Sequence, residues 1–117
     1  MIIGVPGEPV GAQVRAGAVN VIYGSAAGLA GSGGSQYFTA ENLGGASEAD
    51  DIMGQSVCSG DFDGDGYDDA AIGVPGEDIG AADACGQVYI LYGSGAGLSS
   101  SSLQSFDQGY LGETLES

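Results

Sequence analysis

Short apolar, β-branched and aromatic runs, separated by glycine-rich segments, are the main pattern along the chain. The clearest run is Gly86–Gly93, which glycines bound at both ends, as is typical of a β-strand. Alternate positions of this run are apolar on both sides, with Val88, Ile90 and Tyr92 on one face and Tyr89 and Leu91 on the other. A strand in a sheet with one wet face would show a polar side. The pattern therefore predicts a sheet that is covered on both faces.

The same criteria predict further short strands and no substantial helix. The first unit holds strands at Ile2–Val5 and Gly17–Tyr23. The following unit holds four strands, at about Gly54–Gly60, Ala70–Val74, Gly86–Gly93 and Leu103–Asp107. Pro75-Gly76 ends the second of these, because proline and glycine interrupt strands. The serine run Ser99–Ser102 is interpreted as a surface turn.

The chain repeats itself. Ile3–Glu8 returns as Ile72–Glu77, and Tyr23–Leu29 returns in closely similar form as Tyr92–Leu98, at an offset of 69 in both cases (72 − 3 and 92 − 23). A second, weaker similarity relates Gly54–Ser59 to Gly112–Ser117, at an offset of 58 (112 − 54). Repeats of this length indicate a propeller, a solenoid or an array.

Four-stranded sheets that are covered on both faces are the blades of a β-propeller. We predict an all-β fold, a β-propeller fragment of about two four-stranded antiparallel blades, one complete and two partial. Its parts are 1–53, the last three strands of a blade with a connecting loop; 54–111, a complete blade; and 112–117, the first strand of a following blade. Repeat units need neighbours to bury a continuous core. We therefore expect the chain either to assemble or to belong to a longer polypeptide.

Composition and charge narrow the possible partners. The 117 residues include 24 glycines, no Trp and no His, and Arg15 is the single basic residue against 16 acidic ones, for a net charge of −15. Such a polyanion repels nucleic acids and anionic membrane surfaces and attracts cations. No stretch is long and apolar enough for a membrane span, and the N-terminus has no signal-peptide pattern. Cys58 and Cys85 are expected to be buried thiols more readily than a disulfide, since their strands are not direct neighbours.

The segment Asp61–Asp69 carries the candidate chemistry. Its alternating aspartates can converge on one hard cation, and Gly64 and Gly66 permit the tight backbone that wraps around it. Calcium takes six to eight oxygen ligands. We predict one carboxylate oxygen from each of Asp61, Asp63 and Asp65. The main-chain carbonyl of Tyr67 and the carboxylate of Asp69 complete the protein ligands, and water fills any remaining place.

The loop has other possible interpretations. The opening Asp-x-Asp-x-Asp-Gly fits an EF-hand, but the twelfth position is Ile72 where that motif needs Glu, and strands flank the loop. An acidic turn that holds no ion is the simplest alternative. Magnesium is a further alternative, although it demands stricter octahedral geometry and keeps more waters.

These residues resemble the FG-GAP repeat family, the blade unit of integrin α-subunit propellers and many bacterial surface proteins. The matching segments are Gly54–Val57, Gly60–Asp69 and Ile72–Gly76; the family's "GAP" stands here as Gly73-Val74-Pro75, and its "FG" is half kept as Met53-Gly54. The resemblance implies a calcium loop between the first two strands of a blade, with the ligands named above. It also implies an extracellular or cell-surface location and a role in adhesion.

Three functions remain open at this point. One is a non-enzymatic calcium-binding module whose exposed loops bind a protein or a glycan. Another is a structural unit that assembles with itself, head to tail, or with the other blades of a parent propeller. The third, a calcium-dependent hydrolase, is disfavoured because the chain has no His and no Lys, and Arg15 is its only cation. Glu8 and Glu77, which recur after the Pro-Gly turn, are not assigned a catalytic role.

Overall fold

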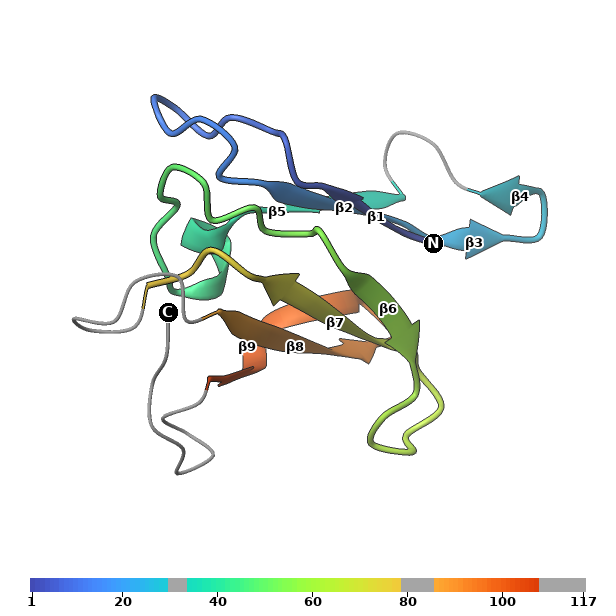
Figure 1. Ribbon diagram of the computed structural model, residues 1–117. Helices are drawn as coiled ribbons and strands as arrows, with labels where there is room; N and C mark the ends of the chain where they lie inside the picture. Colours follow the sequence, from blue (N-terminus) through green and yellow to red (C-terminus); the bar gives the residue numbers. More distant parts are fainter. Residues whose placement is uncertain (30–33, 79–85, 108–117) are drawn as a thin grey trace.

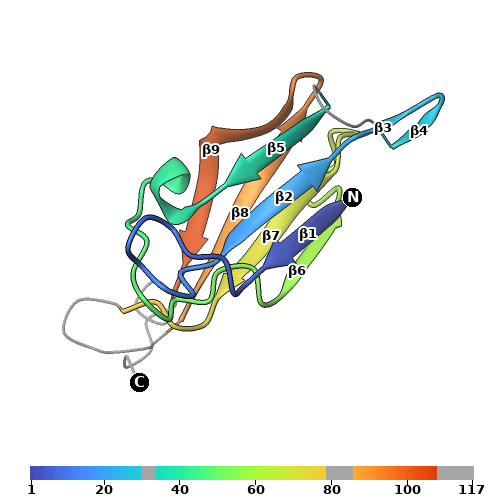
Figure 2. The same ribbon diagram turned by 90° about the horizontal axis from the view of Figure 1, so that it is seen from above.

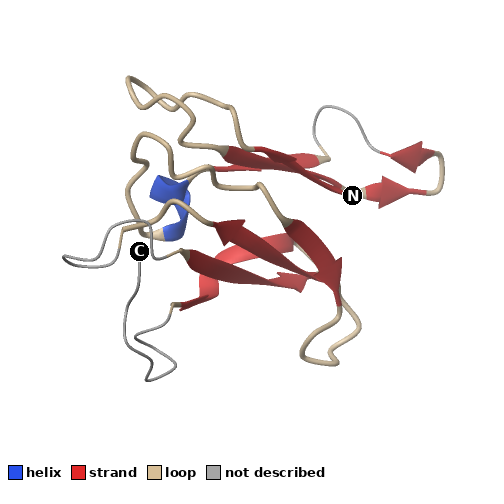
Figure 3. Ribbon diagram, viewed as in Figure 1, coloured by secondary structure: helices blue, strands red, loops and turns tan. Residues whose placement is uncertain are grey.

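The computed structural model describes residues 1–29, 34–78 and 86–107, and these form two stacked layers of antiparallel strands (Figure 1). Apart from one short 3₁₀ helix, Ala40–Leu43, strands and loops make up the described residues (Figure 3). The all-β prediction is confirmed, and the arrangement of separate antiparallel sheets without a closed barrel is consistent with a propeller fragment. Within the described residues, no helix is long and apolar enough to cross a membrane.

The N-terminal sheet has the strand order β1-β2-β5. Its strands are β1 (Ile2–Val5), β2 (Ala18–Ile22) and β5 (Ser35–Phe38), and a separate small hairpin joins β3 (Gly24–Ser25) to β4 (Gly28–Leu29). The second sheet has the order β6-β7-β8-β9. Its strands are β6 (Val57–Gly60), β7 (Asp69–Val74), β8 (Gln87–Ser94) and β9 (Gly97–Phe106). Each strand pairs with its neighbour along the chain, so this sheet is a simple meander.

The core lies between the two sheets, with the N-terminal sheet above the four-stranded one (Figure 2). The four-stranded sheet contributes one face of β7 and β8, on which Ile72, Val74 and Leu91 are fully buried. The N-terminal sheet contributes the face of β2 that carries Val19 and Val21. Burial of apolar side chains at this interface is the main favourable contribution to folding.

Within the single chain, the described residues cover only one face of each sheet, and cover of the second face by a neighbour stays a prediction. Along β8, Tyr89 and Leu91 are buried, whereas Val88 on the opposite face is 40% exposed. Tyr23 packs against the core, whereas its repeat counterpart Tyr92 lies on the open face and outside the core cluster. The reason is that a two-layer arrangement covers only one face of each layer.

Two local predictions need correction. Ser99–Ser102 is not a turn but part of β9, which begins after the turn at Ser94–Gly97 and pairs back onto β8. In this sheet β9 is an edge strand, because only β8 pairs with it. Cys58 is an exposed free thiol rather than a buried one, and Cys85 lies outside the described residues. The guanidinium of Arg15 contacts the carboxylate of Asp50 at 2.5 Å.

The connection between the two sheets runs directly against the N-terminal sheet. Met53 is fully buried, its N–H donates to the carbonyl of Ala16 (3.0 Å), and it forms a parallel bridge with Gly17. Gly17 has a positive φ of 89°, and a Cβ at this position would lie 2.2 Å from the carbonyl oxygen of Met53. Glycine is therefore required at position 17 both for its conformation and for the close backbone approach.

This contact predicts a difference between two glycines. Gly17→Ala should destabilise the protein by at least ~2 kcal/mol more than Gly11→Ala, because the backbone must shift away from the new methyl group. Gly11 also has a positive φ, 59°, but nothing lies within 4 Å of the added Cβ. Gly11→Ala should therefore show only the conformational strain of ~1–2 kcal/mol. Urea unfolding of both variants measures the difference, and equal midpoints would contradict this account of the connection.

Candidate metal centre

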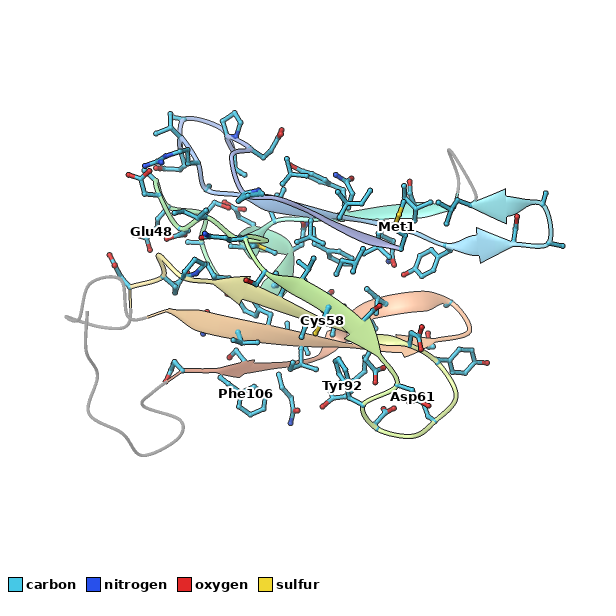
Figure 4. The ribbon with its side chains drawn as sticks, turned by 45° about the vertical axis from the view of Figure 1, so that its right-hand side comes forward. Met1, Glu48, Cys58, Asp61, Tyr92 and Phe106 are labelled. Atoms are coloured by element: carbon cyan, nitrogen blue, oxygen red, sulfur yellow. The ribbon has the colours of Figure 1, made fainter. Side chains whose placement is uncertain are left out.

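The candidate site is the turn between β6 and β7. The pairing of Gly60 with Asp69 closes the turn at its base. Beyond this pair the chain forms a loop that extends past the end of the sheet, and Asp61 marks its beginning (Figure 4). The sheet therefore fixes both ends of a short segment in which four of the eight residues between the paired ends are aspartates.

Asp61 organises the backbone of the loop. Its carboxylate accepts hydrogen bonds from three backbone N–H groups: Gly64 at 2.8 Å, Asp65 at 3.1 Å and Gly66 at 2.8 Å. Gly64 and Gly66 have positive φ values of 77° and 92°, which let the chain curl around this carboxylate as the sequence predicts. These hydrogen bonds, led by that from Gly66, lower the pKa of Asp61, so this carboxylate is ionised at neutral pH.

Asp63 and Asp65 complete a cluster with Asp61. One carboxylate oxygen from each of the three lies within 4.8 Å of the others. Oxygens bound at 2.3–2.6 Å to one calcium ion can be separated by at most about 5 Å, so this spacing fits a shared ion. Partial desolvation, followed by the negative charges of Asp65 and Asp69, raises the pKa of Asp63. The cluster thus concentrates negative charge that a divalent cation would neutralise.

Asp69 has a role that the sequence did not reveal. Its side chain is almost completely buried, with 1% exposed. One oxygen accepts the N–H of Phe62 at 2.7 Å, and the other accepts the N–H of Gly93 on β8 at 2.8 Å. Asp69 therefore fastens the start of the loop to the neighbouring strand. The oxygen that binds Phe62 also accepts a longer bond from the N–H of Asp63 at 3.4 Å. Service of Asp69 as a ligand stays a prediction.

Tyr67 is the remaining predicted ligand. Its backbone N–H donates to Asp65 at 2.9 Å, and its side chain is 49% exposed. The part of the loop around Tyr67 and Asp68 lies against β8, where a Cβ on Gly93 would come within 2.1 Å of the Asp68 carbonyl oxygen. Coordination by the Tyr67 carbonyl stays a prediction.

A second acidic cluster lies at the turn after β7. Glu77 has a carboxylate oxygen that is buried without a hydrogen-bond partner in the described structure. Burial, together with the negative charges of Asp51, Glu48 and Asp78, raises the pKa of Glu77 to about 7. The repeat singled out Glu77, but only the fold brings it beside Asp51 of the connecting segment. These carboxylates do not converge as those of the β6–β7 loop do.

Replacement of Asp69 tests its structural role. Asp69→Asn keeps the shape but exchanges one acceptor oxygen for an amide group that cannot accept, which leaves a buried N–H unpaired. We expect a loss of ~1–3 kcal/mol in the free energy of unfolding. The measurement is made in EGTA so that no ion contributes, and the exposed neighbour Asp68→Asn is the control. If Asp69→Asn is as stable as Asp68→Asn, the anchoring role is wrong.

The shifted pKa of Glu77 predicts a pH dependence with a defined sign. The folded-state pKa of about 7 lies above the ordinary value of 4.5, so the folded state binds this proton more tightly than the unfolded chain. Stability contributed by protonated Glu77 is present below about pH 4.5 and is lost as the pH rises to about 7. The melting midpoint of Glu77→Gln should therefore be higher than that of the wild type at about pH 8, and the two midpoints should be nearly equal at about pH 4. Equal melting midpoints at both pH values would disprove the shift.

Comparison with known proteins bears on the same segment. No curated protein matches the sequence. The family model described as "FG-GAP repeat" matches residues 53–91, which include β6, the aspartate loop, β7 and most of β8. The match therefore spans the structural unit that holds the acidic cluster. Residues 53–91 are thus similar to the FG-GAP repeat family.

Proposed function

We propose that this protein is a non-enzymatic, calcium-binding module of the β-propeller type that mediates adhesion or interaction with a protein or glycan outside the cell. The observation that carries the proposal is the convergence of Asp61, Asp63 and Asp65 at the β6–β7 turn of an FG-GAP repeat. FG-GAP repeats can bind calcium and occur in extracellular proteins, which supports both the ion and the location.

The proposed ion is held by the loop and acts on the sheet. Asp61, Asp63 and Asp65 would each supply a carboxylate oxygen, with the Tyr67 carbonyl and Asp69 completing the set. Such an all-oxygen donor set suits a hard cation, and the flexible coordination of calcium suits a curled loop better than the strict octahedron of magnesium. Because Asp69 also binds the N–H of Gly93, an ion here would tie β6, β7 and β8 together. Calcium would thereby stiffen one end of the four-stranded sheet.

A role in binding fits the chain better than catalysis. FG-GAP repeats are typically structural modules without enzymatic activity. Arg15 is the only basic side chain, and its guanidinium is paired with Asp50. The chain has no His, the side chain that most often acts as general acid or base, and no Lys, so Arg15 is its only side-chain cation for stabilising an anionic transition state. Loops on a rigid sheet, by contrast, are well suited to recognition.

Thermal unfolding with and without calcium tests the proposal. An ion that binds only the folded state at an affinity of about 10⁻⁴–10⁻³ M, as in extracellular modules, should add ~1.4–2.7 kcal/mol at about 10 mM calcium. The melting midpoint should therefore rise by several degrees relative to EGTA. The double variant Asp63→Asn/Asp65→Asn should lose this rise, and Asp68→Asn, in the same loop, should keep it.

Two controls make the result specific. Magnesium at the same concentration should shift the midpoint less than calcium, because the loop favours flexible coordination. Sodium chloride at matched ionic strength separates ion binding from general screening of the net charge of −15. If calcium raises the melting midpoints of the wild type and the double variant equally, the proposed site is wrong.

A further inference from the structure

Each sheet leaves one apolar face open. On the four-stranded sheet the open face carries Val88, which is 40% exposed, and Ile90; Tyr92 and Phe106 point away from the N-terminal sheet (Figure 4). A groove of about 720 Å³, lined in part by Val88 and Phe106, lies at one end of this sheet, beside Pro75 and Gly86. The N-terminal sheet exposes Ile3 (38%) on its outer side.

The repeat relates these two open faces to the two faces that already pack together within the chain. Val88 and Ile90 correspond to Val19 and Val21, at the offset of 69, and both of the latter are buried against the four-stranded sheet. Ile3 corresponds to Ile72, which is fully buried against the N-terminal sheet. The open face of each sheet is thus equivalent to a face that is covered within the chain.

A specific polar contact marks the covered interface. The hydroxyl of Tyr23 donates to Gln36, and this pair binds the main chain of Leu98. The N–H of Leu98 donates to the Tyr23 hydroxyl at 2.7 Å, and Nε2 of Gln36 donates to the Leu98 carbonyl at 3.1 Å. Leu98 itself is 8% exposed and belongs to the core. The tyrosine–glutamine pair therefore fixes where the β8–β9 hairpin lies against the N-terminal sheet.

The same pair is present on the open face. The hydroxyl of Tyr92 donates to Oε1 of Gln104 at 2.6 Å. Gln104 pairs with Ile90 in the sheet register as Gln36 pairs with Val21, so the two tyrosine–glutamine pairs occupy equivalent places. Tyr92 thus offers the hydrogen-bonding groups that Tyr23 uses for Leu98.

The matching hairpin is also present. Ser25 Oγ donates to the carbonyl of Gly28 at 2.8 Å in the β3–β4 hairpin, as Ser94 Oγ does to Gly97 at 3.0 Å in the β8–β9 hairpin. The φ values of the two glycines, 108° and 103°, agree as well. The β3–β4 hairpin has the local geometry of the docked one, yet Leu29, the counterpart of Leu98, is 56% exposed.

We propose that the chain associates head to tail with a second copy of itself, through the Tyr92–Gln104 pair of one copy and the main chain of Leu29 in the second copy. The outer face of the second copy's N-terminal sheet then covers Val88 and Ile90. The interface is heterologous, because the two contributing surfaces differ, so an open assembly retains one unused surface of each kind, one at each end. The aspartate loop plays no part in these contacts.

Charge distribution is compatible with this association. Two chains of net charge −15 repel one another, but the side chains at the proposed contacts are uncharged: Ile3, Leu29, Val88, Ile90, Tyr92 and Gln104. Salt screens the general repulsion over distances beyond about 8–10 Å and leaves apolar contacts intact. Association should therefore strengthen from about 0.15 M to about 1 M sodium chloride.

Sedimentation velocity of the full chain in EGTA tests the proposal, over about 10 µM to about 1 mM protein. The wild type should form dimers and longer species as concentration rises. Leu29→Asp and Tyr92→Asp should each remain monomeric, since each places a charge in one of the two surfaces. Val14→Asp, at a loop position that is 60% exposed, should associate like the wild type. Circular dichroism melting confirms that the variants are folded.

Mixing the variants tests the polarity of the interface. Leu29→Asp retains an intact Tyr92 surface, and Tyr92→Asp retains an intact Leu29 hairpin, so an equimolar mixture should form a one-to-one dimer that grows no further. Tyr92→Phe, which removes only the hydroxyl, should weaken wild-type association by roughly two- to tenfold. A wild type that stays monomeric throughout, or a mixture that forms no dimer while the wild type associates, would overturn the proposal.

Discussion

A sheet that is apolar on both faces has to be covered on both faces, and this constraint governs the whole molecule. The structure satisfies half of it by stacking the N-terminal sheet on the four-stranded one, so that Val19 and Val21 meet Ile72 and Leu91. The backbones also approach closely where Met53 crosses Gly17, and only glycine fits there. The apolar interface and this tight crossing together hold the connecting segment and both sheets in one arrangement.

The candidate metal centre depends on the same arrangement. A loop with four aspartates between its paired ends tends to open, because like charges repel. Here β6 and β7 hold its ends together, and Asp69, which is buried where the loop meets the sheet, binds the backbone at Phe62 and Gly93. Asp61 then gathers three N–H groups of the loop itself. The carboxylates consequently converge on a rigid support, which is what a binding site requires.

Local pattern was sufficient for some of these features and insufficient for others. The strands β7 and β8 and the aspartate loop were predicted because their signals lie within a few residues: alternation, flanking glycines and regular aspartate spacing. The anchoring role of Asp69 and the exposure of Cys58 were missed, since both depend on which strand or layer lies alongside. The raised pKa of Glu77 likewise depends on its burial in the fold and then on Asp51, which is distant in sequence. The FG-GAP resemblance was confirmed for residues 53–91, whereas the ligand set and the blade boundaries stay predictions.

A crystal structure grown in calcium, with anomalous diffraction data, tests the central claim most directly. The account predicts one strong anomalous peak inside the β6–β7 loop, about 2.3–2.6 Å from a carboxylate oxygen of each of Asp61, Asp63 and Asp65. An ordered loop with these carboxylates surrounded only by water, from crystals in abundant calcium, would contradict it.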